Sequence, residues 1–221
     1  MRDARAQKIS DTMRARKLDN FKQWRDEMKR AGKIKSSYPQ LKKNGDLAEL
    51  TGVILGDGHI QKFPRTERLL IFSNANNPGF VKRYALLVEK VFKKKPYVYK
   101  QTDQNCVRIG IYEKNIAKRL EISTGARKQG TFPVPKWIFE NKTYVVRYLR
   151  GLYEAEGSES HHPPTSTHKF SFANRNESLL ENVSQLMQGL GFYLSKDKLR
   201  VQISRKAHVE RAVRLLQFRK Y

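Results

Sequence analysis

The chain has 221 residues, of which 45 are Lys or Arg and 21 are Asp or Glu, so its formal net charge is +24. A cationic surplus of this size predicts a polyanionic partner and favours nucleic acid over a membrane surface. Hydrophobic residues make up 38% of the chain, which is enough for a buried core.

The sequence contains no apolar run that approaches the ~20 residues of a transmembrane helix, and its N-terminus has no apolar signal segment. We therefore expect an intracellular protein, located in the cytoplasm or nucleoid, or in an organelle if the host is eukaryotic.

Residues 1–45 are rich in Lys and Arg, poor in large apolar side chains, and end in the breaks SSYPQ and KKNGD. We expect a basic extension, which either binds DNA or remains a solvated tail. Residues 10–32 within it have helical composition, with Ser10 or Asp11 as the N-cap and Gly32 as the C-cap. The extension is therefore predicted to contain one or two helices.

An internal repeat begins beyond residue 46. The segment LTGVILGDG at 50–58 recurs as LRGLYEAEG at 149–157, so that Asp57 aligns with Glu156. The repeated glycines and the repeated acid make a chance match a poor explanation.

The same succession of segments follows each copy of the repeat. A strand-like segment ends at Asn76 or Asn176, and it is followed by an amphipathic helix, a pair of strands and a final helix at 113–121 or 205–217. Each half therefore reads helix, two strands, helix, two strands, helix. This order predicts an α+β fold.

Small residues four positions apart mark one face of each repeated helix. They are Gly52 and Gly56 in the first copy, and Gly151 and Ala155 in the second. Such a face lets another backbone approach closely, so we expect the two helices to pack on each other. The glycine that follows each acid, Gly58 or Gly157, is predicted to end its helix as a left-handed cap.

Packing of the two helices would bring Asp57 and Glu156 together at one end. Two carboxylates about 4 Å apart repel by about 4 kcal/mol at an effective dielectric constant near 20, and the helix dipole adds to that cost. A divalent cation would compensate both charges. Carboxylate oxygens and nearby backbone carbonyls, here those of Gly56 and Ala155, suit Mg²⁺, which also binds substrate phosphates. The alternative is two ordinary glycine-terminated helices that carry acids near their ends.

The paired segments LTGVILGDG and LRGLYEAEG resemble the motifs of the LAGLIDADG homing endonucleases, particularly the monomeric archaeal intron-encoded members. The resemblance covers roughly residues 46–221. It implies a first repeat at 46–140 and a second at 141–221, related by internal pseudo-twofold symmetry. It further implies two αββαββα halves whose antiparallel sheets form a saddle over double-stranded DNA, with the basic helical extension at the N-terminus.

The resemblance also implies a Mg²⁺-dependent endonuclease, for which Mn²⁺ or Ca²⁺ could substitute as the bound ion. Asp57 and Glu156 would be the metal-binding acids. Polar and basic side chains near the scissile phosphates would be Asn74, Asn174, Arg175, Lys128 and Lys220. The sequence departs from the family in having Ala75 opposite Arg175, and Glu159 where some relatives carry a lysine. Unequal cleavage of the two strands is one expected consequence.

The strands that would face DNA carry candidate base-reading side chains. Alternation along a strand allows only part of this set to reach one face. The candidates in the first half are Gln61, Lys62, Arg65, Arg68, Tyr99, Gln101 and Arg108, and those in the second half are His168, Lys169, Ser171, Lys198, Arg200, Gln202 and Ser204.

Other metal sites are not favoured by the sequence. Cys106 is the only cysteine, which excludes an internal disulfide and a thiolate cluster, and we expect it in a buried strand. His161 and His162 would fit a zinc site, but a loop beside a strand is the favoured interpretation.

Two functions other than cleavage stay open. The scaffold could be a DNA-binding regulator that has lost catalysis, although retention of both acids argues against this. It could also be a maturase that binds intron RNA, because phosphate attraction does not distinguish RNA from DNA.

Overall fold

The computed structural model describes residues 4–16, 19, 21–33, 35, 37–125 and 130–221. The chain divides into two compact units, Met1–Pro39 and Gln40–Tyr221. In the described residues no helix is both long and apolar enough to cross a lipid bilayer.

The first unit consists of two helices, α1 (Ala4–Ala15) and α2 (Lys22–Arg30), and neither buries a residue. Ser10 and Asp11 lie inside α1, so the prediction that one of them is an N-cap was wrong. Gly32 has a φ of +70°, and the amide of Lys33 donates to the carbonyl of Met28, 2.9 Å away. The predicted glycine stop after the second helix is therefore confirmed, one residue beyond the C-cap Ala31.

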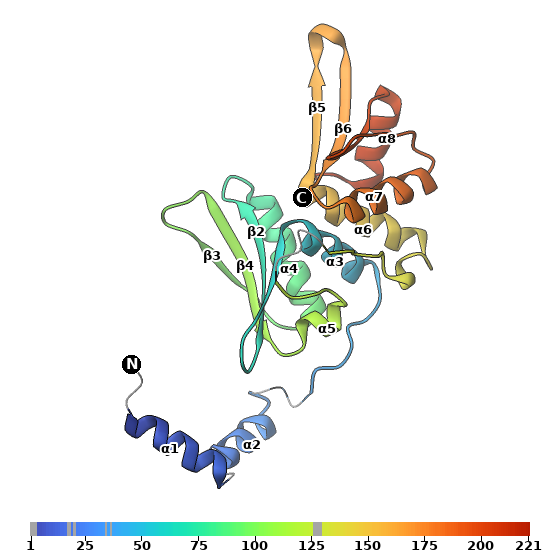
Figure 1. Ribbon diagram of the computed structural model, residues 1–221. Helices are drawn as coiled ribbons and strands as arrows, with labels where there is room; N and C mark the ends of the chain where they lie inside the picture. Colours follow the sequence, from blue (N-terminus) through green and yellow to red (C-terminus); the bar gives the residue numbers. More distant parts are fainter. Residues whose placement is uncertain (1–3, 17–18, 20, 34, 36, 126–129) are drawn as a thin grey trace. The chain divides into compact units, whose positions relative to one another are not determined.

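The second unit contains the predicted αββαββα order twice (Figure 1). The first half comprises α3 (Gly45–Asp57), β1 (Gly58–Lys62), β2 (Glu67–Asn74), α4 (Pro78–Phe92), β3 (Tyr97–Lys100), β4 (Cys106–Glu113) and α5 (Ile116–Leu120). The second half comprises α6 (Lys142–Glu156), β5 (Gly157–His162), β6 (Thr167–Ala173), α7 (Glu177–Gly189), β7 (Ser195–Lys196), β8 (Arg200–Ile203) and α8 (Lys206–Leu216). Short 3₁₀ turns occupy Lys136–Ile138 (η1) and Pro163–Thr165 (η2).

Each half contains one four-stranded antiparallel sheet. The strand orders are β1-β2-β4-β3 and β5-β6-β8-β7, so the two sheets have the same topology. One face of each sheet contributes alternate side chains to the core. We call the opposite face the open face. The core-facing side chains include Leu69, Ile71 and Ile109 in the first half, and Phe170, Phe172 and Val201 in the second.

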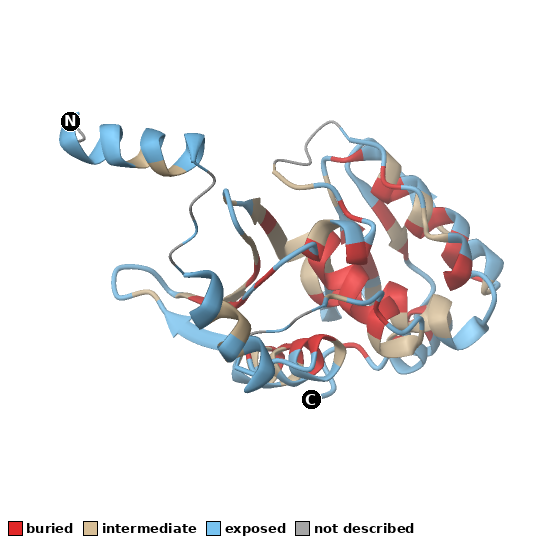
Figure 2. Ribbon diagram, turned by 90° about the horizontal axis from the view of Figure 1, so that it is seen from below, coloured by how far each residue is buried: buried red, intermediate tan, exposed pale blue. Residues whose placement is uncertain are grey.

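Helices α3 and α6 pack on each other at the centre of the core, where buried residues are concentrated (Figure 2). The small residues explain the close approach. A Cβ atom added to Gly52 would lie 2.2 Å from the carbonyl oxygen of Tyr148, and one added to Gly151 would lie 2.1 Å from that of Glu49. The helices therefore touch backbone to backbone, as the repeated spacing predicts.

The two repeated helices are capped in the same way at both ends. The side chains of Asn44 and Asn141 accept backbone amides at the N-termini. Gly58 and Gly157 have φ values of −98° and −88°, so the predicted left-handed caps were wrong. The chain passes directly from helix to strand at these residues, and a Cβ on Gly58 would lie 2.6 Å from Ile54 Cα. Close packing, not a positive φ, requires glycine there.

Candidate nucleic-acid interface and acidic pair

Asp57 and Glu156 are the last residues of α3 and α6, and both are half-buried. The helices meet at this end, because a Cβ on Gly56 would lie 2.4 Å from Ala155 Cβ and 3.1 Å from Glu156 Cγ. The crossing of the two helices therefore brings the two acids side by side.

The environment of the pair opposes ionisation. Burial, together with the charge of Glu156, raises the pKa of Asp57 to about 7, and burial raises the pKa of Glu156. Among the described residues no Lys or Arg forms an ion pair with either carboxylate. The missing positive charge and the hard oxygen donors fit a divalent cation such as Mg²⁺. The described residues contain no group of three His, Cys, Asp or Glu side chains able to hold a metal, so such an ion would take its remaining ligands from backbone carbonyls, water or phosphate.

Asn174 lies beside Glu156, and Asn74 occupies the corresponding loop of the first half. Asn174 Nδ2 donates to Glu156 Oε1 at 3.3 Å, and Asn174 Oδ1 accepts the amide of Asn176 at 2.8 Å. Asn74 Oδ1 accepts the amide of Asn76 at the same distance. Both loops therefore form the same asparagine turn after β2 and β6.

Two of the three basic side chains expected near the scissile phosphates have described positions, and both are exposed. Arg175 is exposed in the loop after β6. Lys220 has an exposed side chain, and its carbonyl accepts Arg150 Nη2 at 2.8 Å. Lys128 lies outside the described residues.

The open face of the first sheet gathers most of the first-half candidates. Gln61 stands opposite Arg68, and Tyr99 stands opposite Arg108. The Arg68 guanidinium bonds to Gln61 Oε1 and to the Tyr112 hydroxyl, and it lies 5.7 Å from the centre of the Tyr112 ring. The arginine is therefore held in place before any ligand binds.

The other three first-half candidates do not lie on the open face of the first sheet. Lys62 alternates with Gln61 and opposes Glu67, so its side chain belongs to the opposite face of the sheet from Gln61 and Arg68. Arg65 lies in the exposed turn between β1 and β2. Gln101 follows β3, where its amide donates to the carbonyl of Cys106 at 2.9 Å.

The open face of the second sheet also carries polar and basic side chains. Its members are Lys169 and Ser171 of β6 and Arg200 and Gln202 of β8, and Ser171 is buried beneath a contact with Gln202 at 3.4 Å. Ser204 follows β8, and its Oγ accepts the side-chain Nε2 of Gln202 at 2.9 Å. Lys198 lies exposed in the turn before β8.

His168 alternates with Lys169 and belongs to the helix side of its sheet, opposite the face that carries Lys169 and Ser171. It opposes His161, and the two rings stack with their centres 4.1 Å apart. His161 and His162 end strand β5, which corrects the prediction that they lie in a loop. Cys106 begins β4 and is half-buried, so the predicted strand is confirmed but full burial is not.

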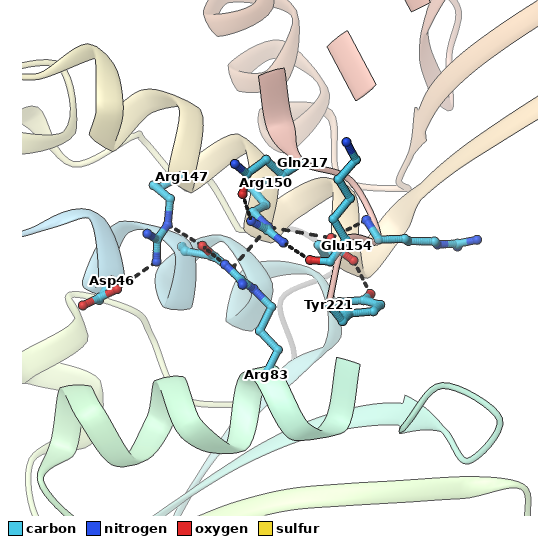
Figure 3. A network of polar contacts seen from close by, with 10 residues as sticks. Asp46, Arg83, Arg147, Arg150, Glu154, Gln217 and Tyr221 are labelled. Atoms are coloured by element: carbon cyan, nitrogen blue, oxygen red, sulfur yellow. Dashed lines mark hydrogen bonds and ion pairs between the residues drawn. The ribbon is translucent and has the colours of Figure 1, made fainter. Parts of the chain in front are cut away.

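A buried network of charges on the helical side went unrecognised in the sequence (Figure 3). Glu49 is fully buried, and its two oxygens accept Arg83 Nε at 2.7 Å and Nη2 at 2.9 Å. Arg147 also pairs with Glu49, and with Asp46 at 2.8 Å. The network joins α3 and α4 of the first half to α6 of the second. An acid within the apolar run of α3 was the only sign of it in the sequence.

The comparisons with known proteins agree with this architecture. A family model described as a LAGLIDADG-like domain matches residues 143–219. No curated protein matches the chain. Among solved structures, mesophilic variants of the homing endonuclease I-DmoI are similar with a TM-score of 0.54 at 19% identity, covering 78% of this chain and 94% of theirs.

Two further structures have the same fold. A crystal structure of I-DmoI in complex with DNA and Mn gives a TM-score of 0.52 at 18% identity, covering 78% of this chain and 96% of that one. The N-terminal LAGLIDADG domain of DUF199/WhiA gives 0.55 at 14% identity, covering 81% and 86%. The repeat, the family match and the fold together define a LAGLIDADG architecture. The family model covers the second half of this unit, and the solved structures share the fold of both halves, so the chain is a single polypeptide with two repeats of this fold.

Proposed function

We propose that the protein is a site-specific double-strand DNA endonuclease that uses a divalent metal, with Mg²⁺ as the expected ion. The observation that carries the proposal is the juxtaposition of Asp57 and Glu156, two half-buried acids without an ion-pair partner among the described residues. A DNA-binding protein gains nothing from such a pair, because two carboxylates repel both each other and the DNA phosphates.

Asp57 and Glu156 would hold the cation, together with backbone oxygens near Gly56 and Ala155. The cation would supply charge stabilisation at the scissile phosphate and a more acidic water. Asn174 would orient the Glu156 carboxylate through its amide, and Asn74 would serve the first half in the same way. Arg175, Lys128 and Lys220 would add positive charge near the phosphates.

The open faces would bind the DNA on either side of this centre. Arg68 and Arg108 in the first half, and Lys169, Arg200 and Gln202 in the second, present the donors that read base edges in a major groove. We also propose that the protein acts inside the cell, where its DNA substrate is. We propose further that it acts as a monomer, since both repeats lie on one chain. Two functions are therefore weighed for this scaffold, cleavage of DNA and binding without cleavage. I-DmoI is a homing endonuclease, whereas the description of DUF199/WhiA names no nuclease activity.

The test is a cleavage selection. The protein would be incubated with Mg²⁺ and a library of DNA duplexes containing randomised segments of about 25 base pairs, and the new ends would be sequenced. We expect ends from one related set of sequences, and none with Asp57→Asn. Binding of a defined sequence without cleavage would favour a regulator, and preferential binding of a structured intron RNA would favour a maturase.

A further inference from the structure

The end of each half of the second unit reaches across to the other half. Residues 217–221, which follow α8, are here called the terminal strap, and residues 130–132, which lie between α5 and α6, are called the linker strap. The terminal strap contacts the start of α4 in the first half, and the linker strap contacts the start of α7 in the second. Both helices begin just after the asparagine loops described above.

The terminal strap is fixed to α6 by Glu154. Its carboxylate accepts the amide of Arg219 at 2.7 Å and the hydroxyl of Tyr221. Arg150, one turn earlier on α6, donates to Gln217 Oε1 at 2.9 Å and to the carbonyl of Lys220 at 2.8 Å (Figure 3). Glu154 precedes Glu156 by two residues, so the strap is attached at the end of the helix that carries the second acid.

The ring of Tyr221 rests on the first half. A Cβ added to Gly79 would lie 2.4 Å from Tyr221 Cδ2, so only glycine leaves room for the ring. Burial and the hydrogen bond to Glu154 raise the pKa of Tyr221. Gly79 lies two residues after Asn77 in the first turn of α4. Asn77 caps α4, and its amide donates to the carbonyl of Asn74 at 3.0 Å. Tyr221 therefore supports the loop that holds Asn74.

The linker strap makes the corresponding contacts in the other direction. Asn176 caps α7 through its Oδ1 atom, and its Nδ2 atom donates to the carbonyl of Gly130 at 2.8 Å. Ser178 Oγ accepts the amide of Phe132 at 3.0 Å. Because the amide of Asn176 bonds to Asn174 Oδ1, this strap supports the loop that holds Asn174.

We infer that the two straps are reciprocal positioning elements. The terminal strap sets the Asn74 loop through Tyr221, and the linker strap sets the Asn174 loop through its bonds to Asn176 and Ser178. Each strap thus governs the cutting of a different DNA strand. The inference rests on the proposed endonuclease activity. A misplacement of about 1 Å in a catalytic group lowers rates by about 100-fold, so loosening one loop changes the ratio of the two strand cuts.

The first experiment measures the two strand cuts separately. A selected target duplex with a different fluorophore on each strand would be cut by wild type, Tyr221→Ala and the double variant Asn176→Ser/Ser178→Ala, in which serine preserves the helix cap. We expect Tyr221→Ala to slow one strand about tenfold more than the other, and the double variant to slow the opposite strand. Tyr193→Phe, a substitution at an exposed tyrosine distant in sequence, is the matched control and leaves the ratio unchanged.

Equal slowing of both strands, or slowing of the same strand by both variants, would overturn the inference. Should Tyr221→Ala fail to fold, Tyr221→Phe removes the bond to Glu154 and keeps the ring on Gly79, so a smaller bias toward the same strand is expected. If Tyr221→Phe and the double variant both fold and neither changes the ratio of the two strand-cleavage rates, the inference is also contradicted.

The second experiment separates this inference from the proposed function. Amide hydrogen exchange of the DNA-free protein would be compared for wild type and Tyr221→Phe. We expect faster exchange at residues 75–80 and no change at 175–180. Absence of cleavage by wild type would refute the endonuclease, whereas unchanged exchange at 75–80 would refute the strap.

Discussion

At the scale of single residues, the raised pKa of Asp57 has a consequence for stability. The folded-state pKa of about 7 exceeds the ordinary 3.8, so the folded protein binds more protons than the unfolded chain between about pH 4 and 7. The contribution of Asp57 to stability is therefore fully present below pH 4 and is lost as the pH rises through 7. The pKa difference corresponds to about 4 kcal/mol at most.

We expect wild type without metal to lose more stability than Asp57→Asn between pH 4.5 and 8, as measured by urea unfolding. Comparing the two proteins cancels the titrating groups that do not interact with Asp57, including Asp46, whose pKa is lowered by Lys90 and Arg147 despite its partial burial. Parallel curves for the two proteins would show that Asp57 titrates normally.

A divalent cation should reverse this loss. Binding at ten times its dissociation constant stabilises the folded state by about 1.4 kcal/mol, because the unfolded chain has no such site. We expect Mg²⁺ or Ca²⁺ to raise the melting temperature of wild type at pH 8 by several degrees. Asp57→Asn should show no such rise, and an equal rise in both proteins would place the ion elsewhere.

At the scale of elements, the contact between α3 and α6 is the most demanding part of the fold. A methyl group on Gly52 would lie 2.2 Å from the backbone oxygen of Tyr148, which cannot move without shifting the helix. We expect Gly52→Ala to destabilise the protein by about 3 kcal/mol or to prevent folding, as judged by thermal unfolding. Gly189→Ala is the matched control, since nothing lies within 4 Å of that position. It should be neutral or stabilise α7 by about 0.5 to 1 kcal/mol.

The elements also show how far the sequence leads. The repeat predicts the αββαββα order and the meeting of Asp57 with Glu156, because small residues and acids recur together at helical spacing. The extended conformation of Gly58 was not predictable from the motif, because it depends on a strand that starts without a turn. The faces of Lys62 and His168 depend on strand register, which composition does not determine.

The charge network around Glu49 could not be predicted from a sequence pattern. Its members come from α3, α4, α6 and the terminal strap, and no spacing along the chain relates them. The straps were likewise invisible, because a glycine such as Gly79 shows its reason only when the ring of Tyr221 is placed against it.

At the scale of the whole molecule, the net charge of +24 predicts DNA affinity that falls steeply with salt. Residues 1–39 hold twelve Lys or Arg and five Asp or Glu. They form a unit of their own with no buried side chain in either helix.

We expect deletion of residues 1–39 to leave the melting temperature of the remaining unit unchanged within about 2 °C. The same deletion should weaken DNA binding and reduce the slope of log affinity against log salt, measured by fluorescence anisotropy. An unchanged slope would mean that the first unit does not contact DNA phosphates.

The central claim is that Asp57 and Glu156 jointly support metal-dependent cutting of DNA. The most direct measurement compares wild type, Asp57→Asn and Glu156→Gln on one selected duplex, with binding measured in Ca²⁺ and cleavage in Mg²⁺. The claim predicts that all three proteins bind the duplex with affinities within about tenfold of one another. It also predicts that only wild type cuts both strands, with each variant slowed at least about 100-fold. Cleavage by both variants at the wild-type rate, or binding without any cleavage by wild type, would contradict it.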